Sequence, residues 1–100
     1  MITKEKAIQI LQASLPHIRN KYHVQRIGLF GSIAAGRNKE ESDVDIVVEF
    51  SKQLGLEYFE MIEFLEKQFN QKVDVITSEG LNSIRNSNTK DSIMQSIIYV

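Results

Sequence analysis

The chain of 100 residues contains no cysteine, no tryptophan and a single proline. Without thiols, a disulfide bond, a thiolate nucleophile and a cysteine-ligated zinc site are excluded. No apolar run approaches the ~18 residues that suggest a membrane span, and the first residues lack the apolar segment of a signal peptide. We therefore expect a soluble, cytoplasmic protein without a membrane partner.

An excess of charge of one sign is also missing. The chain has 12 lysines and arginines against 13 aspartates and glutamates, a formal net charge of -1. This balance gives no global attraction to nucleic acid, so we expect no direct nucleic-acid partner, and any phosphorylated ligand must be held locally. With 42% hydrophobic residues the chain can bury one modest core, which predicts a single domain over residues 1–100.

Hydrophobic periodicity predicts alternating helices and strands. A first helix is expected from an N-cap at Thr3 to about Lys21, with a kink or break at Pro16. Further elements are expected as strands at Val24–Phe30, Asp43–Phe50 and Lys72–Thr77, a helical turn at Ser32–Gly36, and a helix at Leu56–Asn70.

Two further patterns complete the expected architecture. The Leu56–Asn70 helix has an apolar stripe made of Tyr58, Ile62, Leu65 and Phe69, broadened by Phe59 and Met61, and the tail places Ile93, Met94, Ile97 and Ile98 at helical spacing. The run from Ile46 to Val48 is apolar on both faces, which is typical of a central strand. The order of elements predicts an α/β (α+β) fold, a short mixed sheet flanked by helices.

Three acids carry the strongest chemical signal. Asp43 and Asp45 are two residues apart on the expected central strand, so both leave the same face with Cα atoms roughly 6.5–7 Å apart. Asp74 can join them if its strand is a neighbour in the sheet. A carboxylate pair at 4 Å costs about 4 kcal/mol at an effective dielectric of 20, so either an acid is protonated or a cation joins the group. Mg²⁺ takes carboxylate oxygens and leaves positions open for substrate phosphates.

A glycine-serine turn supplies the complementary half. Gly31 permits positive φ, and if Ser32 opens a helical turn, its amide and hydroxyl point toward an incoming anion. Arg37 and Lys39 add positive charge nearby. Each feature alone has a simpler explanation, as a solvated strand end, an ordinary turn or an edge-strand acid, but their joint arrangement favours a functional site. His17 and His23 have no partner at catalytic or metal-ligand spacing and are expected at the surface.

Gly31-Ser32, the run from Ser42 to Asp45, and Asp74 together resemble the signature of the DNA polymerase β nucleotidyltransferase superfamily. The likeness is greatest to its minimal, MNT-domain members, among them antitoxins usually encoded beside a HEPN-domain toxin, an RNase. The segments "IGLFGS", "ESDVDIVVEF", "KVDVIT" and a final helix ending in "IIYV" all look like corresponding family segments.

The resemblance implies a role for each matching residue. Asp43 and Asp45 would bind Mg²⁺, two ions in all, and bridge to ATP; Asp74 would complete the metal site and help deprotonate the acceptor. Gly31 and Ser32 would hold the β and γ phosphates. The implied reaction transfers AMP from ATP to a tyrosine hydroxyl of the HEPN toxin, which is thereby neutralised within a hetero-oligomer.

One position departs from the family pattern. The family commonly has an arginine where this chain has Ala35, and Arg37 follows the next glycine as a possible replacement for a phosphate contact. Two other functions therefore stay open: a non-catalytic antitoxin that acts by binding, and nucleotidyl transfer to the hydroxyl of a small molecule.

Overall fold

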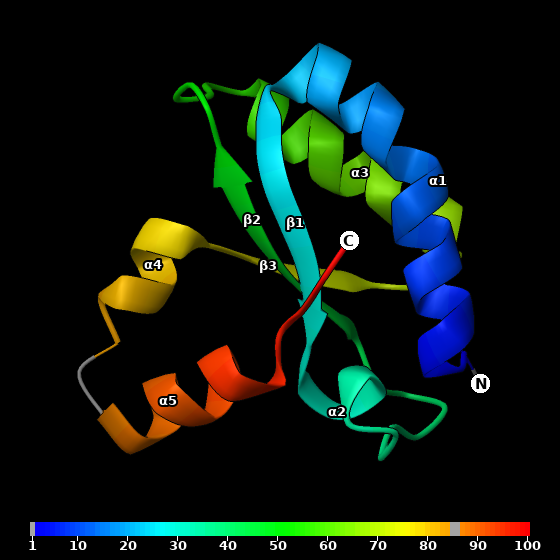
Figure 1. Ribbon diagram of the computed structural model, residues 1–100. Coiled ribbons are helices and arrows are strands. Elements are labelled where there is room, and N and C mark those ends of the chain that lie inside the picture. Colours follow the sequence, from blue (N-terminus) through cyan, green and yellow to red (C-terminus); the bar gives the residue numbers. More distant parts are fainter. Residues whose placement is uncertain (1, 85–86) are drawn as a thin grey trace.

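The computed structural model describes residues 2–84 and 87–100 and contains a four-stranded sheet with strand order β3-β2-β1-β4 (Figure 1). The strands are β1 (Val24–Phe30), β2 (Val44–Phe50), β3 (Val73–Thr77) and β4 (Ile98–Tyr99). β1 runs antiparallel to β2 and to β4, whereas β2 and β3 are parallel. The sheet is therefore mixed, and the expected fold class is confirmed.

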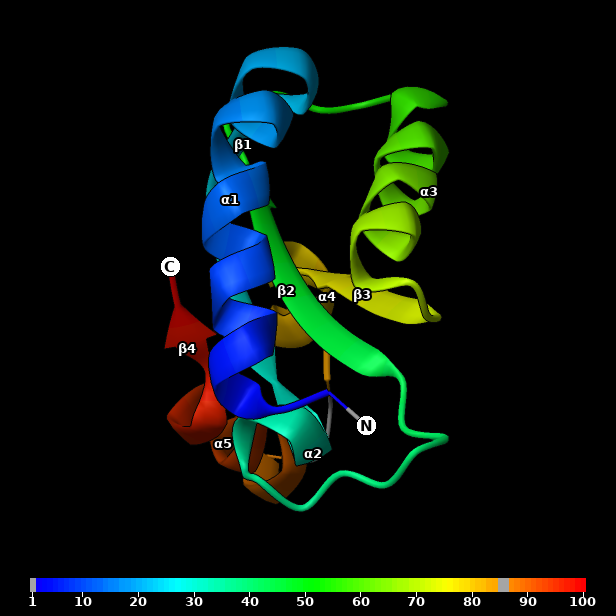
Figure 2. The same ribbon diagram turned by 90° about the vertical axis from the view of Figure 1, so that its right-hand side faces the viewer.

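Five helices surround this sheet in the described part of the chain: α1 (Lys4–Tyr22), α2 (Gly31–Ala34), α3 (Glu57–Phe69), α4 (Ser78–Asn82) and α5 (Ser87–Ser96). The two long helices, α1 and α3, contact each other and cover one side of the sheet (Figure 2). α2 follows directly on β1 and contacts β2 and α5. No described helix is both long and apolar enough to cross a bilayer.

The core lies between the sheet and the α1–α3 pair. Every second residue of β2 points into it, and Val44, Ile46 and Val48 are fully buried there. Asp45, Val47 and Glu49 alternate with them and point to the opposite face. Val47 is also almost completely buried, so β2 is covered on both faces, as its composition predicts.

The first helix differs from the expectation at its proline. Thr3 caps α1 by accepting a hydrogen bond from the Lys6 amide at 3.1 Å, as expected. The helix then continues through Pro16 to Tyr22, so of the predicted kink or break, the break is wrong. Pro16 is exposed, while Ile18 and Tyr22 beyond it are buried, which shows that packing of the last turns outweighs the backbone hydrogen bond that proline removes.

The C-terminal segment also differs. α5 ends at Ser96, and Ile98 and Tyr99 form β4 on the outer edge of β1, so the prediction of one helix through Ile97 and Ile98 is wrong. The Val100 amide donates to the Ile27 carbonyl at 3.1 Å. The outer edge of β1 offers backbone groups with which an added strand can pair, and this favours an extended end over a longer helix.

α3 shows a narrower apolar stripe than expected. Met61, Leu65 and Phe69 are buried, Tyr58 and Ile62 are half-buried, and Phe59 is 62% exposed, so the assignment of Phe59 to the core stripe is wrong.

α3 also covers the outer edge of β3. The Tyr58 hydroxyl donates to the Val75 carbonyl at 3.4 Å, and Glu66 accepts from the Val73 amide at 3.3 Å.

Candidate functional site

Asp45 and Asp74 are neighbours in the sheet. They are Cα partners in the parallel β2–β3 ladder, so their side chains leave the same face from strands spaced about 4.8 Å apart. Asp43 lies immediately before β2, two residues from Asp45. The expectation that the strand carrying Asp74 lies beside the strand carrying Asp45 is confirmed. All three acids are at the amino ends of β2 and β3, on the face opposite α1 and α3.

Gly31 lies directly against Asp45. It has a φ of +77°, in the region that favours glycine, and a Cβ built on it would collide with the carboxylate oxygen Oδ2 of Asp45. The preceding residue, Phe30, is the Cα partner of Asp45 in the antiparallel β1–β2 ladder. The turn after β1 and the acid of β2 therefore meet at one point, where a larger residue would have to displace the Asp45 carboxylate.

Asp45 lies in an environment that disfavours its charged form. Burial, followed by the negative charges of Asp74 and Asp43, raises the pKa of Asp45 from 3.8 to about 6. Among the side chains that the structure describes, no lysine or arginine offsets this rise in the pKa of Asp45. The fold thus concentrates negative charge at the amino end of its central strand.

α2 begins at Gly31, and its first turn has no side-chain cap. The first amides of a helix lack intrahelical acceptors, which suits the start of α2 to binding an anion. Ser32 is half-buried, and its carbonyl accepts a hydrogen bond from the Arg37 amide at 2.8 Å. Arg37 is thereby tied to this turn through its backbone, while its exposed side chain forms no ion pair with any described residue. Ala35, the departure from the expected pattern, is the exposed C-cap of α2.

The chemistry of the acids fits a hard divalent cation. The donor set consists of carboxylates alone, and a cation would offset both the burial and the repulsion that raise the pKa of Asp45. As the side chains stand, no three acidic or histidine residues within 2–84 and 87–100 are close enough together to surround one ion.

The two histidines lie at the surface, as expected. His17 is exposed and its ring stacks on the ring of Phe64, with 4.4 Å between their centroids, and His23 is the exposed C-cap of α1.

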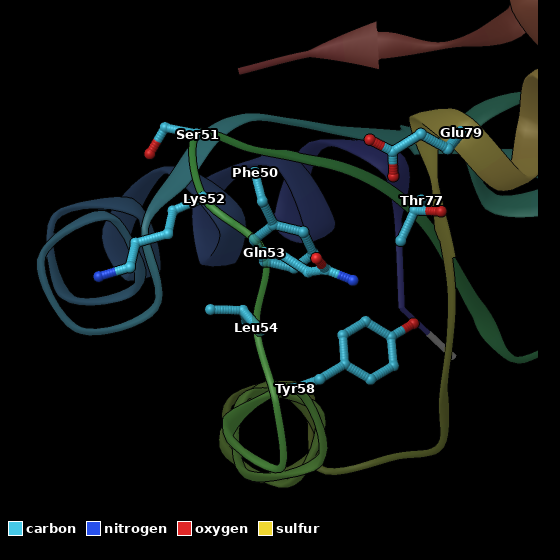
Figure 3. Close-up of a pocket in the computed structure, with 8 residues that line it drawn as sticks. All are labelled: Phe50, Ser51, Lys52, Gln53, Leu54, Tyr58, Thr77 and Glu79. Carbon is cyan, nitrogen blue, oxygen red and sulfur yellow. The ribbon is translucent and has the colours of Figure 1, made fainter.

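A separate cavity of about 570 Å³ lies at the other end of the strands (Figure 3). Its residues come from the ends of β2 and β3, from the segment between β2 and α3, and from the first turns of α3 and α4: Phe50, Ser51, Lys52, Gln53, Leu54, Tyr58, Thr77 and Glu79. Tyr58 reaches from α3 toward Thr77 with its hydroxyl leading (Figure 3). Sequence reasoning did not predict this cavity, because the segment between β2 and α3 has no chemical motif.

The chain matches the family model described as a nucleotidyltransferase domain over residues 7–100. Two of the curated relatives that align with all of this chain illustrate the likeness. One, from Methanocaldococcus jannaschii, is provisionally named a protein adenylyltransferase (MJ1379); it is 44% identical, and its whole length is aligned. The other is the protein adenylyltransferase MntA of Thermococcus cleftensis, which is 34% identical over 98% of its length.

Solved structures share the fold. A structure provisionally described as a minimal nucleotidyltransferase superposes with a TM-score of 0.74 at 21% identity, covering 97% of this chain and 95% of that one. A toxin-antitoxin structure with AMP-PNP superposes with a TM-score of 0.62 at 23% identity. The match covers 98% of this chain and 72% of that one. A complex of a tri-AMPylated Shewanella oneidensis HEPN toxin with an MNT antitoxin superposes with a TM-score of 0.53 at 21% identity. The match covers 96% of this chain and 66% of that one.

Proposed function

The chain belongs to the nucleotidyltransferase domain family, and on that premise we propose that it is a Mg²⁺-dependent protein adenylyltransferase. It transfers AMP from ATP to a tyrosine hydroxyl of a HEPN-domain RNase toxin and thereby neutralises that toxin. The names of the relatives give a protein as the acceptor. A single domain over residues 1–100 and a cytoplasmic setting, where ATP is available, are part of this proposal.

The observation that carries the proposal is the meeting of Gly31, Asp45 and Asp74. Two carboxylates are in register on neighbouring strands, and the glycine turn that begins α2 touches one of them. This places groups that attract a cation beside groups that attract phosphate. A triphosphate accompanied by a divalent cation satisfies both, which an isolated acid or an isolated turn does not require.

Each residue has a distinct role in this proposal. Asp43, Asp45 and Asp74 hold Mg²⁺, which supplies charge neutralisation on the triphosphate when bound. The Gly31–Ser32 turn donates hydrogen bonds to the β and γ phosphates, and the side chain of Arg37 adds a positive charge to the same region. The family resemblance supports these roles; the geometry supports the proximity of the acids and the turn.

The reaction balances as a simple displacement. The acceptor hydroxyl oxygen bonds to the α phosphorus, the bond from that phosphorus to the bridging oxygen breaks, and pyrophosphate leaves. Asp74 accepts the hydroxyl proton. It is exposed on the edge strand β3, so an acceptor on another protein can approach it from solvent.

Intact-mass spectrometry tests the proposed function. The protein is incubated with the HEPN protein encoded beside it, with ATP and Mg²⁺, and the partner's mass is recorded. We expect a gain of one or more AMP groups, located on tyrosine by peptide mapping and absent when Mg²⁺ is chelated. An unchanged partner mass, with a control adenylyltransferase active in the same buffer, would contradict the proposal.

A further inference from the structure

Gln71 joins the loop that precedes Asp43 to the strand that carries Asp74. Its Nε2 donates a hydrogen bond to the Ser42 carbonyl at 2.9 Å, in a partly buried position. Because a carbonyl oxygen only accepts, the amide nitrogen of Gln71 must face it. Ser42 directly precedes Asp43, and Gln71 lies three residues before Asp74.

Ser42 is fixed at all three of its polar atoms. Besides the carbonyl bond to Gln71, its hydroxyl accepts from the Lys39 amide at 2.9 Å, and its amide donates to the Lys39 carbonyl at 3.1 Å. The turn from Lys39 to Ser42 is thus closed on itself. The bond from Gln71 is the one that ties this turn to the β3 side of the site.

Asp43 itself lies outside the ladder of β2. On its far side the Val44 amide donates to the Lys72 carbonyl at 3.0 Å, which is the first link between β2 and the segment leading into β3. Asp43 is therefore held between two anchors, at Ser42 and at Val44. Both anchors are formed by consecutive residues, Gln71 and Lys72, of the segment that ends in Asp74.

We infer that Gln71 is a positioning residue, which fixes the backbone at Asp43 relative to the strand that carries Asp74, the two acids to which the proposed function assigns the cation. The inference rests on the proposed function. Without the Gln71 bond, only Val44 connects the Asp43 backbone to the β3 side, and the Lys39–Ser42 turn can swing with Asp43. Loss of a group that orients a ligand typically weakens metal affinity about 10–100-fold.

Mn²⁺ binding, followed by electron paramagnetic resonance, tests this role. Gln71→Leu keeps the side-chain size and removes the donor, and Gln71→Ala is a second variant should leucine disturb folding. Gln68→Leu and Gln68→Ala are the matched controls, because Gln68 is exposed on α3. We expect the Gln71 variants to bind Mn²⁺ at least about tenfold more weakly than wild type, and the Gln68 variants to bind as wild type does.

Two further readouts separate positioning from a general loss of stability. In AMP transfer, the Gln71 variants should need more Mg²⁺ for half-maximal rate and recover most of kcat when Mg²⁺ is saturating. The Ser42 and Val44 amides should exchange hydrogen faster, with the α1 amides unchanged. Equal Mn²⁺ affinity for the Gln71 and Gln68 variants would overturn the inference and leave the proposed function standing; wild-type protein that neither binds Mn²⁺ nor transfers AMP would overturn the proposed function.

Discussion

Asp45 and Asp74 are Cα partners on neighbouring parallel strands, and the backbone of Gly31 packs directly against the Asp45 side chain. The fold therefore holds two like charges on one face, with a third acid, Asp43, just before the same strand. Such an arrangement costs stability in the absence of a cation. Several measurable properties depend on that cost.

Stability without metal should depend on pH through Asp45. The folded state raises the pKa of Asp45 from 3.8 to about 6, so between these values the folded protein keeps a proton that the unfolded chain has released. The free energy of unfolding should therefore fall as pH rises through this window, with no further change from this group above it. Urea unfolding in chelator-treated buffer measures it, and Asp45→Asn should lack this component. A wild-type profile parallel to that of Asp45→Asn would contradict the assignment.

Mg²⁺ should stabilise the folded protein at neutral pH. A ligand that binds only the folded state at 100 times its Kd adds about 2.7 kcal/mol to the free energy of unfolding. We expect a rise in Tm with Mg²⁺ for wild type, a much smaller rise for Asp45→Asn, and a rise like that of wild type for Glu63→Gln, an exposed acid on α3. A similar Mg²⁺ response in all three proteins would show that the cation binds elsewhere.

Gly31 and Gly36 form a matched pair for substitution by alanine. Both have positive φ, +77° and +71°, but only Gly31 has a side chain against it; around Gly36 a Cβ would meet open space. Gly36→Ala should cost about 1–2 kcal/mol from backbone strain alone. Gly31→Ala should cost more and displace the Asp45 carboxylate, with loss of AMP transfer. Chemical denaturation and the transfer assay measure both effects, and equal costs for the two variants would contradict the close contact.

The central strand and the acid pair could be predicted from the sequence for a physical reason. Ile46 to Val48 is apolar on both faces, which places the strand at the centre of the sheet, and residues two apart on a strand share a face. The prediction that Asp45 and Asp74 lie close together required one further condition, that β3 pairs with β2 in the sheet. The contact between Gly31 and Asp45, and the bond from Gln71 to Ser42, depend on side-chain placement that periodicity does not encode.

The two segments that sequence reasoning got wrong share a cause. At Pro16 the local preference disfavours a helix, and at Ile98 the helical spacing of apolar residues favours one. In both places tertiary contacts outweigh the local signal: burial of Ile18 and Tyr22 keeps α1 continuous, and the free edge of β1 recruits β4. Spacing alone cannot distinguish an apolar pair on a helix from one on a short edge strand.

The docking of β4 should depend on Tyr99. The Arg26 guanidinium lies over its ring, 4.0 Å from the centroid, and Gly28 leaves room for the ring because a Cβ there would meet Tyr99 Cδ1 at 3.0 Å. Tyr99→Ala should destabilise β4 by about 0.5–1 kcal/mol, and Tyr99→Phe should retain most of the interaction. Faster hydrogen exchange at the Val100 amide in the alanine variant checks this; equal exchange in both variants would argue that the ring contributes nothing.

The central claim, that Asp43 and Asp45 serve AMP transfer, is tested most directly by co-expressing the chain with its HEPN toxin and measuring both growth and toxin mass. We expect wild type and Glu63→Gln to protect the cells, with AMP on the recovered toxin. The Asp43→Asn/Asp45→Asn double variant, confirmed as folded, should leave the toxin unmodified and the cells unprotected. Full protection by the double variant, with unmodified toxin, would contradict catalysis and identify the chain as an antitoxin that acts by binding alone.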